Sequence, residues 1–148
     1  MLIRHLKLSD LDALLALYEH LHKSDAPLPE RAVVERVWRE LVANRSYRYY
    51  GVFVGASLLS SCTLAIIPNL TRGCRPYGVI ENVVTHVGHR RKGYAKAILR
   101  EALKDAWATN CYKVMLLTGR KDEATLRFYE SVGFDRHGKQ GFIAKPAV

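Results

Sequence analysis

The run from Val79 to Ala106 constrains the fold more than any other part of this chain. It opens with an apolar, β-branched segment over residues 79–85, a pattern that predicts a buried strand. A basic turn that contains Gly93 follows. Apolar residues then return with the spacing of a helix, at Ala95, Ile98, Leu99, Ala102, Leu103 and Ala106. The run therefore predicts a strand, a basic glycine-containing turn and an amphipathic helix in direct succession.

The turn over residues 90–95 has the composition of a phosphate cradle. Gly93 lets the backbone approach an anion closely, and the free amides at the start of the next helix point toward it. Arg90, Arg91 and Lys92 add three positive charges. The same composition is also typical of a solvated basic loop, so the motifs around the turn decide between the two interpretations.

Those motifs give the chain a family resemblance. The sequence resembles the GNAT superfamily of acyl-CoA-dependent N-acetyltransferases, whose pyrophosphate loop has the pattern Gln/Arg-x-x-Gly-x-Gly/Ala and which carries a later aromatic-Tyr-(x)3-Gly-Phe signature. The matching residues are Arg90, Gly93 and Ala95 in the loop, and Phe128, Tyr129, Gly133 and Phe134 in the signature. The resemblance covers about residues 79 to 144; before residue 79 only the order of the elements is similar.

Length and charge limit the other classes of protein. A chain of 148 residues is long enough to bury its own core, so we expect a single N-acetyltransferase domain over residues 1–148. The formal net charge of +9 would suit nucleic acid, but the charges are spread from Arg4 to Lys145, and no recognition-helix or RNA-binding aromatic pattern is present. A polyanionic cofactor accounts for the densest cluster, over residues 90–96, so no nucleic-acid partner is expected.

The hydrophobic pattern predicts a soluble protein. No apolar run reaches the roughly 18 residues that a bilayer span requires, and the first residues lack the apolar core of a signal peptide. We therefore expect a cytoplasmic protein with no membrane partner, and leave the formation of a homodimer open.

The chain as a whole predicts an α/β fold: a mixed, mostly antiparallel central sheet flanked by about four helices. The expected strands cover residues 1–8, 47–54, 57–67, 77–85 and 112–118, with a final hairpin around Gly138 formed by Phe134 and residues 140–144. The expected helices cover residues 11–21 after a Ser9-Asp10 cap, 33–44, 95–108 with Asn110 as a C-terminal cap, and 123–132 between Asp122 and Gly133. Gly55-Ala56 predicts a hairpin turn, and residues 68–76 a polar loop.

Acetyl transfer to an amine needs a base, because amines with a pKa near 10 are mostly protonated at neutral pH. Glu81, an ionisable residue within an apolar strand, is the candidate. An ion pair with Arg or Lys, or exposure at a strand edge, is the structural alternative. Strand alternation predicts Asn82 on the opposite face, where it would orient the acceptor or satisfy backbone groups.

The resemblance implies acetyl-CoA as the cosubstrate and Tyr129 as the general acid that protonates the departing thiolate; packing in an aromatic core is the alternative role for Tyr129. It also implies that backbone amides late in the central strand hold the pantetheine arm and the oxyanion. At residue 122 this chain has Asp where many members have an Asn that contacts pantetheine. The implied cofactor-binding residues are Val83, Val84, Thr85, Arg90, Arg91, Lys92, Gly93, Tyr94, Ala95, Lys96, Asp122 and Phe128.

Acceptor binding is assigned to Asn82 and to side chains in two loops, His22, Arg72 and Arg75. The two arginines precede the central strand and would suit an acidic acceptor, although exposed loop arginines usually contact water. His86 and His89 are spaced as a metal pair, but no third ligand is patterned nearby, so no metal is predicted.

These patterns favour an N-acetyltransferase that acts on the primary amine of a small molecule by direct attack in a ternary complex. The second half looks somewhat like glucosamine-6-phosphate N-acetyltransferases, which carry an acidic pair where this chain has Glu81-Asn82. Acetylation of protein N-termini or lysines, and a non-catalytic acyl-CoA-binding role, remain the alternatives.

Overall fold

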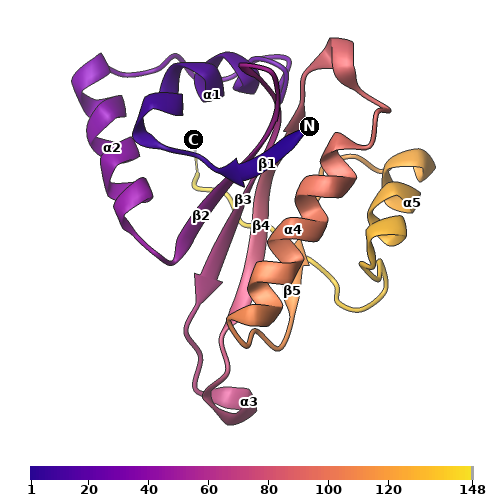
Figure 1. Cartoon of the computed structure of the whole chain (residues 1–148). Helices are drawn as coiled ribbons and strands as arrows, with labels where there is room; N and C mark the ends of the chain where they lie inside the picture. The colour runs from indigo at the N-terminus through magenta and orange to yellow at the C-terminus, as the bar shows by residue number, and fades with distance from the viewer. Residues whose placement is uncertain (148) are drawn as a thin grey trace. The chain divides into compact units, whose positions relative to one another are not determined.

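The computed structural model describes residues 1–147 and confirms the predicted α/β architecture (Figure 1). The chain divides into two compact units, Met1–Leu116 and the part from Leu117 onward. The first unit holds a sheet whose strand order, over the described residues, is β1-β2-β3-β4-β5. The first three pairings are antiparallel and the last, between β4 and β5, is parallel. The prediction of a mixed, mostly antiparallel sheet is therefore confirmed.

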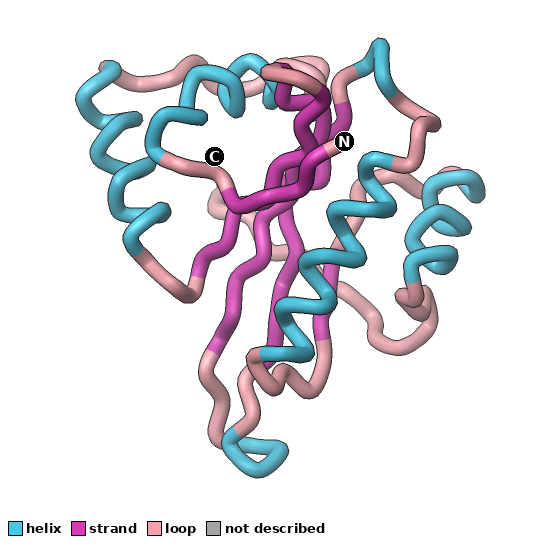
Figure 2. Tube along the Cα trace, in the orientation of Figure 1, coloured by secondary structure: helices cyan, strands magenta, loops and turns pink. Residues whose placement is uncertain are grey.

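The secondary structure is drawn along the chain in Figure 2. The elements of the first unit are β1 (Leu2–His5), η1 (Leu8–Asp10), α1 (Leu11–Tyr18), α2 (Arg31–Ala43), β2 (Tyr47–Val54), β3 (Ser57–Ile67), α3 (Thr71–Cys74), β4 (Tyr77–Thr85), η2 (Val87–His89), α4 (Tyr94–Ala108) and β5 (Val114–Leu116). The second unit contains α5 (Glu123–Val132). Over residues 1–147, none of the helices has both the length and the apolarity needed to cross a bilayer.

Helices cover both faces of the sheet, as two neighbouring residues of β2 show. The ring of Tyr49 packs edge-on against Trp38 of α2, with ring centroids 5.1 Å apart. The hydroxyl of Tyr50 instead donates a hydrogen bond to Asp105 of α4 at 2.8 Å. Because successive residues of a strand point to opposite faces, α2 and α4 lie on opposite sides of the sheet. Leu14 of α1 packs in the same cluster as Trp38, so α1 and α2 share a face.

Local sequence signals predicted several boundaries of strands and helices correctly. Gly55, with φ of +58°, forms the two-residue turn of a hairpin in which Val54 pairs with Ser57. The long helix α4 ends at Ala108, and Asn110, two residues further on, has a φ of +67°, the left-handed conformation that Asn tolerates. The amide of Cys111 then bonds the carbonyl of Ala106 at 3.0 Å, which closes the helix end.

In the second unit, α5 has the caps that its sequence predicts. The Asp122 carboxylate accepts a hydrogen bond from the amide of Thr125 at 3.1 Å. Gly133 ends the helix with φ of +120°. The predicted helix over residues 123–132 is therefore confirmed at both ends.

The predicted cap of the first helix was wrong. Asp10 lies in η1, and its side chain makes no capping bond to α1. Its carboxylate binds both guanidinium nitrogens of Arg4, at 2.7 and 3.0 Å, and the amide of Lys7 at 2.6 Å. A tertiary ion pair has replaced the local cap, and α1 ends at Tyr18, three residues earlier than expected.

Three other sequence predictions are corrected. No strand forms between residues 134 and 147, so the predicted final hairpin is absent from the described chain; Phe142 and Ile143 are exposed there and lack the packing that a hairpin needs. The predicted strand over 112–118 shortens to Val114–Leu116 and is half-buried. The loop over 68–76 contains the single turn α3, in which Arg72 and Gly73 have left-handed backbones.

Candidate active site

The strand β4 carries an irregularity at the position of the predicted base. Thr63 of β3 pairs with Glu81, whereas Ser61, two residues before Thr63, pairs with Val84, three residues after Glu81. The extra residue on β4 makes a β-bulge, and Asn82 within it has φ of +53°. Such a bulge turns side chains out of the alternating pattern of a regular strand.

The same segment of β4 has an open edge. The parallel pairing with β5 ends where Ile80 meets Leu116. From Glu81 to Thr85, no further pairing with β5 occurs in the described chain. The backbone of residues 81–85 is therefore bulged on one side and unpaired with β5 on the other. That arrangement suits backbone binding of an extended ligand, the role predicted for Val83, Val84 and Thr85, which stays a prediction.

Glu81 is exposed, although it lies in an otherwise apolar strand. None of the ion pairs formed among residues 1–147 includes it. Of its structural alternatives, exposure is therefore the one observed. The carboxylate is open to solvent and to an approaching ligand.

Cross-strand pairing places Glu81 in a line of polar side chains. Tyr49 of β2 pairs with Thr63 of β3, and Thr63 pairs with Glu81 of β4. Directly opposed residues of antiparallel strands project to the same face. We call Tyr49, Thr63 and Glu81 the polar row; through Tyr49, it faces α1 and α2.

Tyr18, the last residue of α1, stands over this row. Its phenol is close to Tyr49, Thr63 and Asn82, and burial raises its pKa well above the ordinary value for tyrosine. Tyr18 therefore stays protonated and acts as a hydrogen-bond donor. Asn82 and Thr63, the cross-strand partner of Glu81, are thus both close to the Tyr18 phenol. The prediction that Glu81 and Asn82 face opposite sides of the sheet was therefore wrong. It assumed regular strand alternation, which the bulge interrupts.

Two hydroxyl groups of β3 are left unsatisfied on this face. The Oγ1 atom of Thr63 and the Oγ atom of Ser61 are buried and make no hydrogen bond within the described chain. The two residues are two positions apart, so they project to the same side of the sheet. An unpaired buried polar group costs about 1–3 kcal/mol. These unpaired hydroxyls could not be predicted from the sequence, because a lone Thr between Cys62 and Leu64 is ordinary in a strand.

The predicted phosphate cradle has the backbone geometry that an anion requires. Arg91 has φ of +61° and Gly93 has φ of +82°, and Gly93 is the N-cap of the 15-residue helix α4. No side chain caps the helix, and its first turn has no acidic residue. A Cβ built on Gly93 would meet no atom within 4 Å. The loop therefore leaves open space in front of free amides, which fits the diphosphate of coenzyme A.

The predicted cations around this loop have different surroundings. The Arg90 guanidinium donates to the carbonyl of Thr85 at 3.4 Å and to that of His20 at 3.2 Å. It ties the loop to β4 and to the segment after α1, besides adding charge. Lys92 Nζ lies 3.4 Å from His89 Nδ1. Arg91 is exposed, whereas Tyr94, Ala95 and Lys96, at the start of α4, are half-buried.

Three histidines pack beside the cradle. The rings of His20 and His86 have centroids 4.2 Å apart, and those of His86 and His89 are 5.2 Å apart. Desolvation and the nearby charge of Lys92 lower the pKa of His89. Among residues 1–147, no group of three or more His, Cys, Asp or Glu side chains could hold a metal. His22, predicted to bind the acceptor, is exposed. The histidine of this loop that packs against His86 is His20.

Arg72 and Arg75 are not brought together with Glu81. Arg75 donates to the carbonyls of Asn110 and Cys111, both at 3.3 Å, beyond the end of α4. The Arg72 guanidinium lies over the Tyr112 ring at 5.7 Å. Glu81 lies six positions after Arg75, which is roughly 20 Å of extended chain. The arginines therefore lie near the start of β4 and the bulge lies past its middle.

The second unit contains the other predicted site residues. Tyr129 is half-buried between aromatic rings, with centroid distances of 5.1 Å to Phe128 and 6.2 Å to Phe134. Asp122 serves as the cap of α5 and pairs with Arg120 at 3.0 Å. The roles assigned to Asp122, Phe128 and Tyr129 remain predictions.

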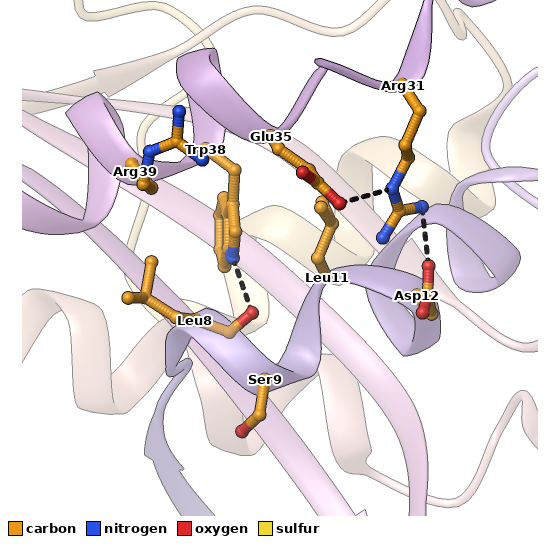
Figure 3. Close-up of a pocket in the computed structure, with 8 residues that line it drawn as sticks. All are labelled: Leu8, Ser9, Leu11, Asp12, Arg31, Glu35, Trp38 and Arg39. Carbon is orange, nitrogen blue, oxygen red and sulfur yellow. Dashed lines mark hydrogen bonds and ion pairs between the residues drawn. The ribbon is translucent and has the colours of Figure 1, made fainter. Parts of the chain in front are cut away.

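A groove with a volume of about 320 Å³ lies between α1 and α2 (Figure 3). Arg31 bridges Asp12 and Glu35 at its rim, at 2.7 and 3.0 Å. The Trp38 indole nitrogen donates to the carbonyl of Leu8 at 3.1 Å. None of the predicted site residues lines this groove.

The family of the chain follows from its match to known proteins. The family model described as the Acetyltransferase (GNAT) family matches residues 12–134. The chain therefore belongs to the GNAT family of acetyltransferases, enzymes that take the acetyl group from acetyl-CoA, and the predicted acyltransferase class is confirmed.

Two curated relatives carry a more specific name, glucosamine 6-phosphate N-acetyltransferase. The protein of Trypanosoma brucei brucei is 37% identical over 83 residues, which are 56% of this chain and 54% of the relative. The protein of Schizosaccharomyces pombe is 32% identical over 81 residues, 55% of this chain and 70% of the relative. The matched stretch thus spans only about half the length of the first relative.

Solved structures support the fold over nearly the whole chain. A structure from Agrobacterium tumefaciens str. C58 has 40% identity and a TM-score of 0.92, covering 99% of this chain and 100% of that one. An acetyltransferase of Trypanosoma brucei has 29% identity and a TM-score of 0.80, covering 97% of this chain and 99% of that one.

Proposed function

We propose that this chain transfers an acetyl group from acetyl-CoA to the primary amine of a small molecule, by direct attack within a ternary complex. One observation carries the proposal: the exposed carboxylate of Glu81 lies at the β-bulge of the strand that leads into the anion-binding loop. The family match runs from residue 12 to residue 134, so we propose that both units act as a single N-acetyltransferase domain.

Each group of residues has one task in this proposal. The amides at the start of α4 hold the diphosphate of the cosubstrate, with charge from Arg90, Arg91, Lys92 and Lys96. The backbone of residues 83–85 lies along the open edge of β4, where it holds the pantetheine arm and donates to the carbonyl oxygen. Glu81 accepts a proton from the substrate ammonium, directly or through water, and so makes the amine nucleophilic. Asn82 orients that amine.

Tyr129 is assigned as the general acid on family resemblance, with Asp122 and Phe128 as neighbouring cofactor contacts. Its phenol gives a proton to the departing thiolate. A thiol with a pKa near 8.5 is a fair leaving group, so Tyr129→Phe should slow turnover on the order of 10²-fold rather than abolish it. Affinity for CoA should stay within a few-fold. Unchanged turnover would leave Tyr129 with a packing role alone.

A thiol-release assay with acetyl-CoA across a panel of amines tests the function. Glucosamine 6-phosphate comes first, because the two curated relatives are named for it. Peptides with a free N-terminus or a lysine belong in the same panel, because their acetylation is the main alternative. Binding of CoA with no acetylated amine would favour the non-catalytic alternative.

Calorimetry tests the cofactor site separately. Gly93→Val should weaken CoA binding severely, because a side chain would fill the open space and disfavour the left-handed backbone at φ of +82°. Gly73→Val is the matched control, since Gly73 has φ of +69° and equally open space but lies in α3. Equal CoA affinity in the two variants would remove the basis of the cofactor assignment.

A further inference from the structure

The unsatisfied hydroxyls of β3 need an explanation that the proposed reaction does not give. Proton removal involves only Glu81, the exposed member of the polar row, and assigns no role to Thr63 or Tyr49. Thr63 is 6% exposed, and its Oγ1 atom has no partner at hydrogen-bonding distance and angle within the described chain, although the phenols of Tyr18 and Tyr49 are close enough to interact with it electrostatically. A buried hydroxyl without a partner is rare, and a ligand group that completes its hydrogen bonds is one of the few explanations.

The chemistry of this cluster is narrow. Burial raises the pKa of both Tyr18 and Tyr49, so both phenols stay neutral. Thr63 and Asn82 are also uncharged. The cluster therefore combines neutral donors and acceptors around one position, beside the single carboxylate of Glu81. Neutral groups of this kind match hydroxyls, which both donate and accept, and they offer little to an alkyl chain or to a second cation.

The cluster also has a defined position relative to the proposed reaction. Thr63 is the direct cross-strand partner of Glu81, and opposed side chains of antiparallel strands lie about 4.5–5.5 Å apart at Cβ. A ligand whose amine meets Glu81 would thus present its neighbouring atoms to Thr63 and Tyr18. The distance suits a hydroxyl on the carbon next to the amine, or one carbon further.

We propose that Tyr18, Thr63 and Asn82 form a recognition site for hydroxyl groups of the acceptor, which makes the acceptor class a polyhydroxylated primary amine. The inference rests on the proposed function, because it takes Glu81 as the place where the amine binds. Tyr18 acts as a positioning residue: it donates to an acceptor hydroxyl and takes no part in proton transfer. Alkyl polyamines lack these hydroxyls and would leave Thr63 unsatisfied.

A split between KM and kcat tests the role of Tyr18. Tyr18→Phe removes one hydroxyl and should raise the KM for a polyhydroxylated amine, with glucosamine 6-phosphate as the probe, by at least 10-fold. The kcat should change less than 3-fold, and the KM for acetyl-CoA should stay unchanged. With a simple alkylamine such as butylamine the variant should match the wild type. Thr63→Val should show the same selectivity.

The matched control is Tyr50→Phe, which removes a buried phenol from the other face of the sheet, where it bonds Asp105. It should leave the ratio of the two KM values at the wild-type value. Equal effects of Tyr18→Phe on both amines, or none on either, would overturn the recognition site while the acetyltransferase activity of the wild type still stands.

If the wild type acetylates no amine, the proposed function has failed. A binding measurement then tests the hydroxyl-recognition site by itself. Proteins with ¹³C-labelled tyrosine rings are titrated with glucosamine 6-phosphate and, separately, with butylamine. A ring shift of Tyr18 with the sugar alone, absent in Tyr18→Phe, supports the hydroxyl site. A shift with both ligands or with neither overturns it.

Discussion

The two faces of the sheet handle their polar groups in opposite ways, and adjacent residues of β2 mark the difference. On the α4 side, Tyr50 is fully buried and donates to Asp105, which also lies 3.1 Å from His5. On the α1 and α2 side, Tyr49 is half-buried beside Thr63, whose hydroxyl lacks a partner in the described chain. One face has a completed hydrogen-bond network and the other has an incomplete one.

The difference separates a polar group that stabilises the fold from one available to a ligand. A satisfied network next to the apolar core of α4 lowers the free energy of the folded state and rigidifies it. Buried hydroxyls without partners raise that free energy unless a ligand binds them. Substitutions that break the Tyr50–Asp105 hydrogen bond should therefore change stability, and substitutions in the polar row should change activity.

The largest effect is expected for Glu81→Gln. Loss of a general base lowers turnover by about 10²–10⁴-fold, and the deficit should grow as the pH falls, because more of the amine is then protonated. The exposed side chain should leave the melting temperature and the CoA affinity unchanged. Glu101→Gln, the same change on α4, is the control for amide substitution. A wild-type pH–rate curve in Glu81→Gln would place the base elsewhere.

A large loss of stability is expected on the other face, for Asp105→Ala. The buried hydroxyl of Tyr50 would lose its acceptor, which should lower the free energy of unfolding by about 2 kcal/mol. Turnover per folded molecule should not change. Urea denaturation followed by circular dichroism gives the free energy.

The double variant Asp105→Ala with Tyr50→Phe sharpens this prediction. Removal of both partners is less harmful than removal of one, so the double variant should recover part of the stability. A double variant less stable than Asp105→Ala would show that the phenol has another partner.

A smaller loss of folding stability is expected when the pH is lowered. The Arg4 side chain lowers the pKa of Asp10, although burial opposes it. Burial raises the pKa of Asp105, but hydrogen bonds from Tyr50 and His5 lower it more. Both folded pKa values thus lie below the unfolded value of about 3.9, so each carboxylate stabilises the fold above pH 4 and loses that contribution as the pH falls through its folded pKa.

Unfolding measured between pH 6 and pH 2 should show the loss below pH 4, and Asp10→Asn and Asp105→Asn should each flatten the curve. A decline that begins near pH 6 in the wild type would point to histidines instead.

The smallest effect is expected at the groove, for Arg31→Ala. Arg31, Asp12 and Glu35 have side chains that are 51%, 80% and 46% exposed, and water screens such pairs (Figure 3). The melting temperature should stay within measurement error. A drop of several degrees would show that this side of the molecule also depends on ion pairs for its stability.

Most of the fold was predictable because its signals are local. The Gly55-Ala56 turn, the left-handed cap at Asn110 and the Asp122 cap each specify a boundary through a few neighbouring residues. The glycine-containing turn before α4 was predictable for the same reason, because the φ of +82° at Gly93 is a conformation that glycine adopts without strain. Glu81 was identifiable as a candidate because an ionisable residue in an apolar strand is unusual.

Other features depend on residues that are far apart in the chain, and only the tertiary structure decided them. The bulge at Asn82 comes from the register between β3 and β4, and it reversed the predicted side of a side chain. Asp10 turned from a helix cap into the partner of Arg4. Tyr18 and Thr63, 45 positions apart, meet because α1 packs on the same face to which β3 turns Thr63. Local patterns specify which residues form helices and strands, but pairing register and packing decide which side chains meet, because those contacts join segments that no short window contains.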